Sequence, residues 1–514
     1  MNPRVPPDTI QHDEREIDTI QHDEQELKRF GYVQELYRTM GGFSNFAISF
    51  TIISILSGPL TLFAFGLTAS GPAAAAYGWP IVTVFVMFVA LNMAETASAF
   101  PTTGGLYFWS SMLGGSGWGW FTGWFNLIGQ VAITAGIDYG LAIFIDALVN
   151  QWAPHFPTAG QPGVEATLGI YAVLLLIHAL LNINGVRIVA ILNDVSVWWH
   201  VGGATLIVAT LLFLAPHHVH VWSFIYGFAQ THTGFPLWYG FLIGMLLASY
   251  TITGFDASAH MSEETIGAST APSWGIVLSV AISGIVGYIL LLGMVASIPS
   301  MTKTLAAANP VLYIFTTRLG SVGGTLLFAM ALVAMFFCGM SSVTANSRMI
   351  YAFARDGGLP ASGTLRKLNK IRSPQNAIWL SVILAFLLAV PALWSSVVYS
   401  AVTSIGVIGL FISYVTPAFL KLIHPERFTP GPWNLGKYSR IVGWLAVGWV
   451  IFICILFSLP VVRPVTLSNF NYTPVVLVVV VGVLVTWYLV KVRYEFKGPS
   501  IIQKSDSAEQ LAKL

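Results

Sequence analysis

Residues 50–67 read FTIISILSGPLTLFAFGL, an apolar run that Ser57, Gly58 and Pro59 interrupt near its middle. Proline removes a backbone donor and clashes with the preceding turn, and glycine lowers the cost of unwinding. Residues 246–265 read LLASYTITGFDASAHMSEET, a second apolar run interrupted by Gly254. Matching interruptions in two halves of a chain indicate a transporter built from repeats with a site at mid-membrane. The alternative is two ordinary glycine kinks, which are common in membrane helices.

The composition places the chain in a membrane. Only 9% of its 514 residues are charged and 55% are hydrophobic, whereas soluble domains have about 25% charged residues. So few charges cannot cover a soluble surface of this size, so most of the outer surface must face the lipid bilayer. The net charge of +2 gives no reason to expect nucleic acid as a partner. The two cysteines, Cys338 and Cys454, both lie in apolar runs and form neither a disulfide framework nor a metal cluster.

Apolar runs of about 20 residues predict roughly twelve membrane-spanning helices. They lie at 43–67, 76–99, 118–148, 166–184, 188–214, 237–259, 275–298, 322–350, 376–395, 398–420, 440–460 and 473–492. With both termini inside, basic residues gather on the inner side, and only Lys303, Arg318 and Arg463 fall outside. One missed span would invert every later loop, so this asymmetry supports the count. We therefore expect a multi-pass protein of the plasma membrane with both termini in the cytoplasm.

Five segments carry a resemblance to a known family. They read GGFSNFAISFTIISILSGP (41–59), AETASAFPTTGGLYFW (94–109), NINGVRIVAILNDVS (182–196), YTITGFDASAHMSEET (250–265) and TANSRMIYAFARDGGLP (344–360). At these residues the chain resembles the amino acid–polyamine–organocation (APC) superfamily of permeases. It looks closest to the amino acid/choline transporter branch, which includes GABA permeases. The resemblance implies an all-α membrane fold of about 12 helices. These would form a five-plus-five inverted repeat, like the leucine-transporter fold, with two extra C-terminal helices, working by alternating access.

The expected organisation has five parts. They are a cytoplasmic acidic N-terminal tail (1–40), the first five-helix repeat (41–214), the second five-helix repeat (237–421), helices 11 and 12 (440–492) and a cytoplasmic C-terminal tail (493–514). The N-terminal tail contains the sequence DTIQHDE twice, at 8–14 and 18–24. Because this duplicated segment is polar and acidic, we expect it to be disordered.

The first break is a candidate site for a carboxylate. An unwound helix leaves backbone polar groups unpaired, which a membrane tolerates only where they face a cavity or a ligand. The N–H groups around Ser57, Gly58 and Leu60 lie at the positive end of the outer half-helix and are candidates to bind the carboxylate. Pro59 has no N–H to offer. Family permeases usually carry a Gly-Ser-Gly run here, whereas this chain has Leu56-Ser57-Gly58, so one glycine is missing.

The second break is a candidate site for an ammonium group. The carbonyls of Tyr250, Thr251 and Thr253 end the outer half-helix beside Gly254 and suit a cation. By resemblance, Tyr250 takes the position of an aromatic gate over the substrate; the alternative is a tyrosine at the membrane interface. Asp256 follows the break, and an acid at membrane depth costs roughly 2.5–3.5 kcal/mol, so it needs a partner. It is a candidate to pair with the substrate amine, to relay a proton or to cap the inner half-helix.

The fifth span carries a candidate coupling residue. Residues 193–200 read NDVSVWWH. They align by resemblance with a segment in which some relatives place a lysine six residues after the acid, where it replaces a sodium ion. Here that position is His200. Histidine exchanges protons easily near neutral pH, so His200 is the candidate that senses or carries a coupling proton. The alternative is a buried neutral histidine bonded to a carbonyl.

Charged residues near the inner ends of three helices are candidates for a cytoplasmic gate. They are Glu95, Glu263 and Arg348, together with Glu264 and Arg355. Opposite charges at this level would form ion pairs that break when the gate opens. The alternative is that the pairs are permanent anchors.

These features predict a secondary active transporter for a small zwitterion, an amino acid or GABA, in symport with protons. No cofactor and no covalent chemistry are expected, and the sequence does not indicate the oligomeric state. Choline or polyamine transport is the alternative, in which Asp256 would become the main counter-charge. A channel would need a ring of charges or carbonyls, an enzyme would need a catalytic motif, and the sequence offers neither. No metal site is expected at His217, His218 and His220, because no Asp, Glu or Cys lies nearby.

Overall fold

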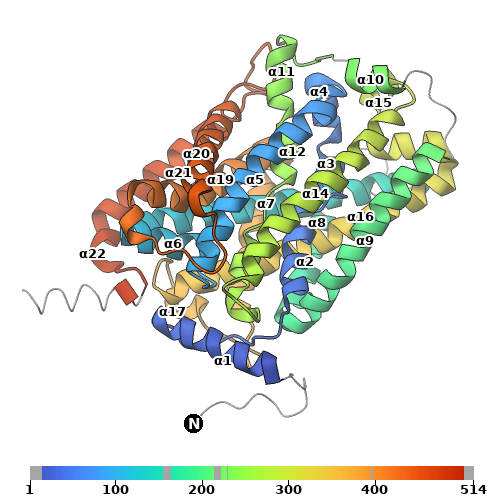
Figure 1. The fold of residues 1–514 in the computed structure, drawn as a ribbon. Helices are drawn as coiled ribbons and strands as arrows, with labels where there is room; N and C mark the ends of the chain where they lie inside the picture. Colours follow the sequence, from blue (N-terminus) through green and yellow to red (C-terminus); the bar gives the residue numbers. More distant parts are fainter. Residues whose placement is uncertain are drawn as a thin grey trace, which may run out of the picture.

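The computed structural model describes residues 14–153, 164–213, 221–227, 230–394, 397–499 and 501–502. Within these ranges the chain is helical, and it forms no strand beyond one isolated bridge between Met40 and Thr265. Eleven helices in the described ranges are long and apolar enough to cross a membrane, and the shorter apolar stretch Leu237–Thr251 supplies another. The predicted all-α membrane fold of about twelve helices is confirmed (Figure 1).

The spanning elements follow one another along the chain with short connections. They are α2 (Gly42–Ile53), α3 (Gly58–Thr61), α4 (Phe63–Ser70), α5 (Trp79–Ala99), α7 (Ser116–Trp152), α8 (Val164–Ile183), α9 (Val186–Phe213), α11 (Leu237–Gly244), α12 (Leu246–Thr251), α13 (Ala257–His260), α14 (Ala271–Ala296), α16 (Pro310–Arg355), α18 (Gln375–Ala389), α19 (Val398–Ile423), α20 (Ser439–Leu456) and α21 (Thr473–Trp487). The remaining α-helices are α1 (Glu14–Arg29), α6 (Gly105–Gly114), α10 (Val221–Gly227), α15 (Met301–Ala306), α17 (Ser362–Leu365) and α22 (Arg493–Glu495). A non-helical residue, Gly320 with φ of 74°, divides α16 close to the predicted start of that span.

The first spanning helix is interrupted, as the sequence predicts, between α2 and α3. Ser54 has φ of 40°, in the left-handed region, and the helix resumes at Gly58. The sequence predicts unwinding at 57–59, whereas the unwound residues are 54–57 and Pro59 lies in the first turn of α3. Proline is well tolerated there, because the N–H that it lacks would have no helical partner.

The sixth spanning helix is also interrupted, between α12 and α13. The helix ends at Thr251 and resumes at Ala257. Gly254, inside the gap, has φ of 80°, which an L side chain rarely adopts. Both predicted interruptions are therefore present, and each leaves a few residues of extended or turning backbone in the bundle interior.

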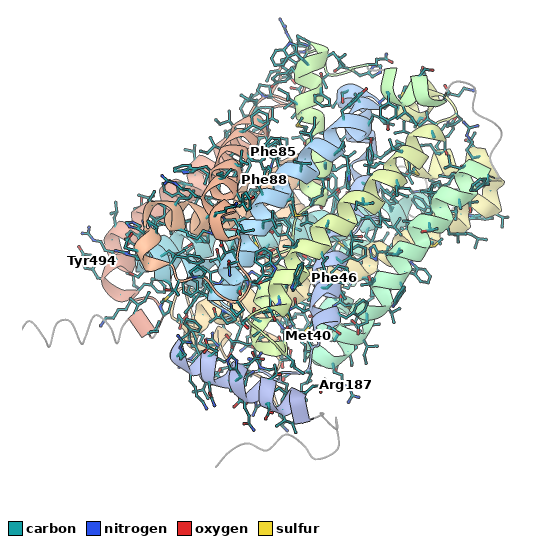
Figure 2. The ribbon with its side chains drawn as sticks, viewed as in Figure 1. Met40, Phe46, Phe85, Phe88, Arg187 and Tyr494 are labelled. Atoms are coloured by element: carbon teal, nitrogen blue, oxygen red, sulfur yellow. The ribbon has the colours of Figure 1, made fainter. Side chains whose placement is uncertain are left out.

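Helix α7 forms the centre of the bundle and packs against α6, α8, α16 and α19. Glycine permits the close approach: a Cβ at Gly129 would lie 2.6 Å from the backbone nitrogen of Leu410 in α19. At the periphery, Phe85 of α5, labelled in Figure 2, stacks on Trp449 of α20 with ring centroids 4.7 Å apart. Exposed apolar side chains such as Val478 cover α21, as expected for a helix that faces lipid.

The N-terminal segment from residue 14 onwards is folded against the bundle, so the prediction of disorder is wrong for this part; residues 1–13 lie outside the described ranges. Helix α1 contains the second DTIQHDE copy and lies at the end of the bundle opposite α4, α10 and α11 (Figure 1). Asp23 accepts hydrogen bonds from the N–H groups of Gly267 and Ala268 at 2.8 and 3.1 Å. Arg38 donates to the carbonyl of Ser262 at 2.9 Å. These specific bonds compensate the entropy that a polar segment loses on docking.

The same segment also contacts the inner end of α16. The Tyr32 hydroxyl donates to Asp356 Oδ2 at 2.6 Å, and the Arg355 guanidinium lies 3.9 Å from the Tyr32 ring centroid. Burial raises the pKa of Asp356 to about 7, compared with about 4 in an unfolded chain. The folded protein therefore holds a proton that the unfolded chain has lost between about pH 4 and pH 7. This proton contributes its full stabilisation of the folded state below about pH 4, and that contribution is lost as the pH rises through about 7.

We expect Asp356→Asn to remove this pH dependence, because the amide does not titrate. Between about pH 5 and pH 8 the melting temperature of the wild type should fall relative to that of the variant, by about 2 °C or more. Thermal unfolding of both purified proteins in detergent measures the difference. Tyr32→Phe is the control, since it removes the hydrogen bond but keeps the carboxyl and its titration. An equal difference between wild type and Asp356→Asn at both pH values would contradict the assignment.

Candidate substrate-binding site

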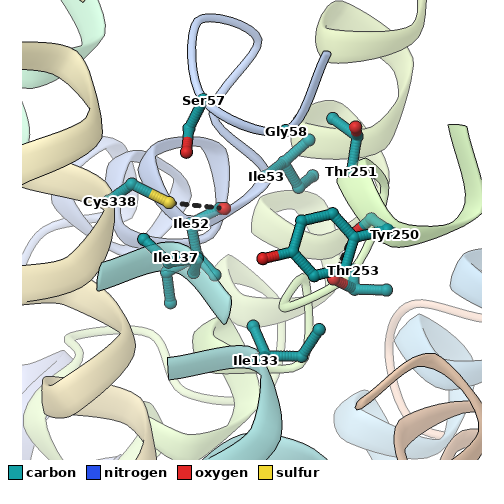
Figure 3. Close-up of a pocket in the computed structure, with 10 residues that line it drawn as sticks. All are labelled: Ile52, Ile53, Ser57, Gly58, Ile133, Ile137, Tyr250, Thr251, Thr253 and Cys338. Carbon is teal, nitrogen blue, oxygen red and sulfur yellow. Dashed lines mark hydrogen bonds between the residues drawn. The ribbon is translucent and has the colours of Figure 1, made fainter. Parts of the chain in front are cut away.

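The two helix breaks meet at a small cavity in the interior of the bundle. Its walls combine both breaks with side chains of α7 and α16: Ile52, Ile53, Ser57, Gly58, Ile133, Ile137, Tyr250, Thr251, Thr253 and Cys338 (Figure 3). The cavity volume is about 10 Å³, enough for about one water molecule. The structure is therefore closed over the cavity, which must widen before it holds a solute of several heavy atoms.

At the first break, only part of the backbone is free to bind a ligand. The N–H of Ser57 donates to the carbonyl of Ser54 at 2.9 Å, and the N–H of Leu60 donates to the carbonyl of Ser57 at 3.1 Å. These turn and helix bonds occupy two of the three expected donors, so Ser57 and Leu60 are not free donors here. The N–H groups of Ile55, Leu56 and Gly58 have no partner among the described residues. Gly58 therefore remains as an expected donor that is free and borders the cavity.

At the second break, which lines the same cavity, some carbonyl oxygens are free. The carbonyl of Tyr250 accepts a bond from the Thr253 hydroxyl at 2.7 Å. The carbonyls of Thr251, Ile252 and Thr253 accept no hydrogen bond within the described part of the chain. A positive group in a widened cavity would therefore find acceptors at Thr251 and Thr253, two of the three expected positions, in the cavity that Gly58 also lines.

The Tyr250 side chain belongs to the cavity wall. It is 4% exposed, and its ring extends from the second break toward Ile52 and Ile137 (Figure 3). Its hydroxyl approaches α7 so closely that a Cβ at Gly136 would lie 2.6 Å from it. The alternative of a tyrosine at the membrane interface is therefore wrong.

Glycine is required where the two breaks touch. A Cβ at Gly58 would lie 2.9 Å from the Cα of Thr251, which is backbone and cannot swing away. A Cβ at Gly254 would collide with the side chain of Ile52, and the positive φ of Gly254 adds strain. The two breaks therefore pack directly against each other through their glycines.

Asp256 follows the second break in the chain and does not line the cavity. Its carboxylate accepts four hydrogen bonds: from Tyr414 at 2.7 Å, Gln130 at 2.8 Å, and Asn126 and His260 at 3.2 Å each. It makes no capping bond to α13, so the capping alternative is wrong. Protein groups fill both of its oxygens, which answers the need of a buried acid for partners.

The sequence analysis misses His260, which is completely buried. Its Nε2 lies 3.2 Å from Asp256 Oδ2, and its Nδ1 lies 3.1 Å from the carbonyl oxygen of Thr103. The signal was present, because residues four apart share one face of a helix and the sequence FDASAH places Asp256 and His260 at that spacing. The polar pair Asn126 and Gln130, also four apart in an apolar span, gives a second signal of the same kind.

His200 lies beside the first break. Its Nε2 is 2.7 Å from the hydroxyl of Ser54, the residue with positive φ, and its Nδ1 is 2.8 Å from the carbonyl of Ser196. A neutral ring satisfies both contacts, because Nδ1–H donates to the carbonyl and Nε2 accepts from the hydroxyl. The contacts therefore match the alternative of a buried neutral histidine.

The charged residues at the inner end form separate ion pairs. Arg355 pairs with Glu263 at 2.9 Å, and Arg348 pairs with Glu264 at 3.0 Å, so α16 is tied to the segment after α13. All four side chains are buried or nearly so. These pairs lie beside the N-terminal segment, because the Arg355 guanidinium also contacts the ring of Tyr32.

Glu95 does not belong to that group. It pairs with Lys421 of α19 at 2.5 Å, and it also accepts from the Ser439 hydroxyl and the N–H of Leu435 before α20. Glu95 thus joins α5 to α19 and to the start of α20, which fits a permanent anchor better than a gate shared with Glu263 and Arg348.

Within the described residues, no cluster of three His, Cys, Asp or Glu side chains could hold a metal ion. The outer-loop histidines His217, His218 and His220 lie outside the described ranges.

Known proteins resemble this chain over nearly its whole length. A family model described as amino acid permease matches residues 40–481. Amino-acid permease BAT1 of Arabidopsis thaliana is 40% identical over 491 residues, covering 92% of this chain and 95% of the relative. The amino-acid permease BAT1 homolog of Oryza sativa subsp. japonica is 38% identical, covering 92% and 94%. A putative polyamine transporter of Candida albicans is 27% identical, covering 91% and 87%.

The contact between the two breaks gives a direct test of the site. We expect Gly58→Ala to lower the uptake of labelled amino acids into proteoliposomes by about tenfold or more. The added methyl must push Thr251 away, and overpacking of this kind costs about 1–3 kcal/mol. Gly202→Ala in α9 is the matched control, since a Cβ there meets nothing within 4 Å. Gel filtration shows whether both variants fold, and equal uptake by the folded variants would refute the direct contact as a requirement.

Proposed function

The chain belongs to the amino acid permease family, and we propose that it moves a small zwitterion, an amino acid or GABA, across the membrane by alternating access with protons as the driving ion. Its relatives are named as permeases and transporters, which are not enzymes. We further propose that it works in the plasma membrane with both termini in the cytoplasm. The side with α1 is then the cytoplasmic side.

One observation carries the proposal: residues with free N–H and C=O groups line the same cavity between the breaks. Gly58 offers an N–H at the start of α3, where the helix dipole is positive. Thr251 and Thr253 offer carbonyls beyond the end of α12, where the dipole is negative. A zwitterion presents a carboxylate and an ammonium group, so it satisfies both sets of groups at once. Tyr250, beside them in the wall, is suited to cover the bound solute as a gate.

The alternative substrate is a cation such as choline or a polyamine, in line with the name of the Candida albicans relative. In that case Asp256 would be the counter-charge. Four protein donors already fill its carboxylate, and it does not line the cavity. Removing these donors to bind a cation would leave buried polar groups unpaired. This arrangement favours the zwitterion.

Alternating access requires a seal on each side of the site. The pairs Glu263–Arg355 and Glu264–Arg348 are suited to seal the inner side, and we propose that they part when the protein opens inward. Buried ion pairs hold strongly when intact and are costly to leave half broken, so they favour two discrete states.

A proton is the proposed driving ion, and two buried histidines are candidates to carry it. His200 lies at the first break and holds Ser54. His260 lies below the second break and contacts Asp256.

Competition for uptake in proteoliposomes tests the substrate class. Individual labelled amino acids and GABA serve as substrates, choline and putrescine as competitors, and pH or sodium gradients are imposed separately. We expect unlabelled zwitterions to compete, choline and putrescine not to compete, and an inward proton gradient to increase uptake. Liposomes without protein give the background.

Two results would reject the proposal. Competition by choline or putrescine without competition by zwitterions would make the protein a cation transporter. Uptake that follows a sodium gradient and ignores a pH gradient would keep the substrate class but exclude protons as the driving ion.

A further inference from the structure

We propose that Asp256 and His260 share the coupling proton, and that this pair links the second break to the inner ion pair Glu263–Arg355. The proposal rests on the proposed function, since it names the proton site of that same transporter. It places the proton below the cavity rather than at His200.

The two ring nitrogens of His260 both face hydrogen-bond acceptors. Nε2 faces the carboxylate of Asp256 at 3.2 Å, and Nδ1 faces the carbonyl of Thr103 at 3.1 Å. A carbonyl oxygen has no hydrogen to donate, so Nδ1 must carry a proton. The contact at Nε2 also needs a proton, either on the ring or on the carboxyl. The pair therefore holds one proton more than a neutral histidine beside a carboxylate.

The donors around Asp256 assign that proton to the ring. Tyr414, Gln130 and Asn126 all donate to the carboxyl group, at 2.7, 2.8 and 3.2 Å. Hydrogen bonds donated to a carboxyl favour its ionised form. Asp256 is then a carboxylate and His260 an imidazolium, and the pair as a whole is neutral, which a membrane interior tolerates far better than a lone charge.

The other buried histidines of the described chain lack this arrangement. The contacts of His200 are complete with a neutral ring, because its Nε2 meets the hydroxyl of Ser54, which can donate. His178 faces Asp138 with Nδ1 at 3.3 Å, but its Nε2 has no partner among the described residues. Neither ring needs a second proton, whereas His260 does.

Each element around the pair contributes a different group. Helix α7 contributes only the amides Asn126 and Gln130, and α19 contributes the phenol of Tyr414. The backbone at Gly105 covers the His260 ring, since a Cβ there would lie 3.1 Å from it. Asp256 is the charged side chain in direct contact with His260.

The Asp256–His260 pair is connected to the second break through Tyr414. The hydroxyl of Tyr414 accepts a bond from the N–H of Gly254 at 3.0 Å and donates to Asp256 Oδ1 at 2.7 Å. Gly254 lies directly after Thr253, whose carbonyl is a proposed ligand for the substrate ammonium group. A change in the charge of the pair therefore reaches the substrate site through one side chain.

The Asp256–His260 pair is also connected to the ion pair Glu263–Arg355, through Thr103. The carbonyl of Thr103 accepts from His260, and the backbone N–H of the same residue donates to Glu263 Oε1 at 3.1 Å. Glu263 in turn binds Arg355 of α16 at 2.9 Å. The proton site and the gate thus hold the same residue from two sides.

Loss of the proton must disturb one of these contacts. A neutral His260 has a single N–H, so either Nδ1 releases the carbonyl of Thr103 or the lone pair of Nε2 faces the carboxylate of Asp256. The first outcome loosens Thr103, which also holds Glu263. The second outcome places a lone pair against a carboxylate, and the repulsion displaces the His260 ring, whose Nδ1 contacts Thr103. Either change weakens the inner seal, so release of the proton and opening of the seal favour each other.

The charge state is tested first, without any substrate. Protein labelled with 15N at its histidines is compared by NMR at about pH 8, where ordinary histidines are neutral. We expect one imidazolium resonance in the wild type, its loss in His260→Gln, and its retention in His178→Gln and His200→Gln. Asp256→Asn provides a second variant if His260→Gln does not fold, and it should also remove the resonance. A neutral His260 in the folded wild type would overturn the proposal.

Transport then separates this proposal from the proposed function. Substrate exchange needs no net proton movement, whereas accumulation driven by a pH gradient does. With the best labelled zwitterion from the competition screen, we expect His260→Gln to lower the ratio of gradient-driven uptake to exchange by about tenfold or more, within the usual range of coupling factors. His178→Gln, the matched substitution, should leave this ratio within about twofold of the wild type.

The outcomes are distinct. Exchange by the wild type with an unchanged ratio in His260→Gln would overturn the proton site but leave the transporter intact. A ratio that falls in His200→Gln instead would move the proton to the first break. Absence of both exchange and accumulation of any zwitterion by the folded wild type would reject the proposed function itself.

Discussion

The structure depends on one constraint: a backbone polar group inside a lipid bilayer needs a partner. Two helices of this chain are interrupted and leave some backbone polar groups unpaired. The fold brings these two interruptions together. Gly58 lies so close to Thr251 that an added Cβ would meet the Thr251 backbone, and Gly58 of one break and Thr251 and Thr253 of the other line one small cavity. Each break alone would leave buried polar groups unpaired, which costs free energy in a membrane. In the proposed function, a solute with two opposite charges completes the surface that the two breaks form together.

The sequence predicts this part of the molecule well, because its causes are local. Proline and glycine interrupt apolar runs wherever they stand, and an acid such as Asp256 is conspicuous at membrane depth. Local sequence does not show which backbone amides remain free. The N–H groups of Ser57 and Leu60 are occupied by turns that depend on where Ser54 reverses the chain. The surroundings of His260 are equally non-local, since Thr103 comes from far along the sequence. Docking of α1 depends on bonds to distant loops, which composition alone does not reveal.

Polar side chains inside the bundle follow the same logic as the breaks. Asn126 and Gln130 of α7 and Tyr414 of α19 converge on Asp256, so a carboxylate that would be costly in isolation sits in a nearly complete shell of donors. Such a shell specifies one arrangement of three helices, because displacing any member leaves a buried group unpaired. The centre of the molecule is therefore held by directional bonds, while the periphery is held by apolar contacts such as Phe85 on Trp449.

The N-terminal segment bridges two parts that inward opening would separate. Asp23 and Arg38 hold the turn after α13, while Tyr32 and Glu35 receive or donate bonds at the inner end of α16. The segment thus connects these two parts of the bundle, and under the proposed alternating access its detachment would contribute to the free energy of the transport cycle. A partner that binds this segment, or a modification that adds charge to it, would therefore change the rate of transport without contacting the solute pathway.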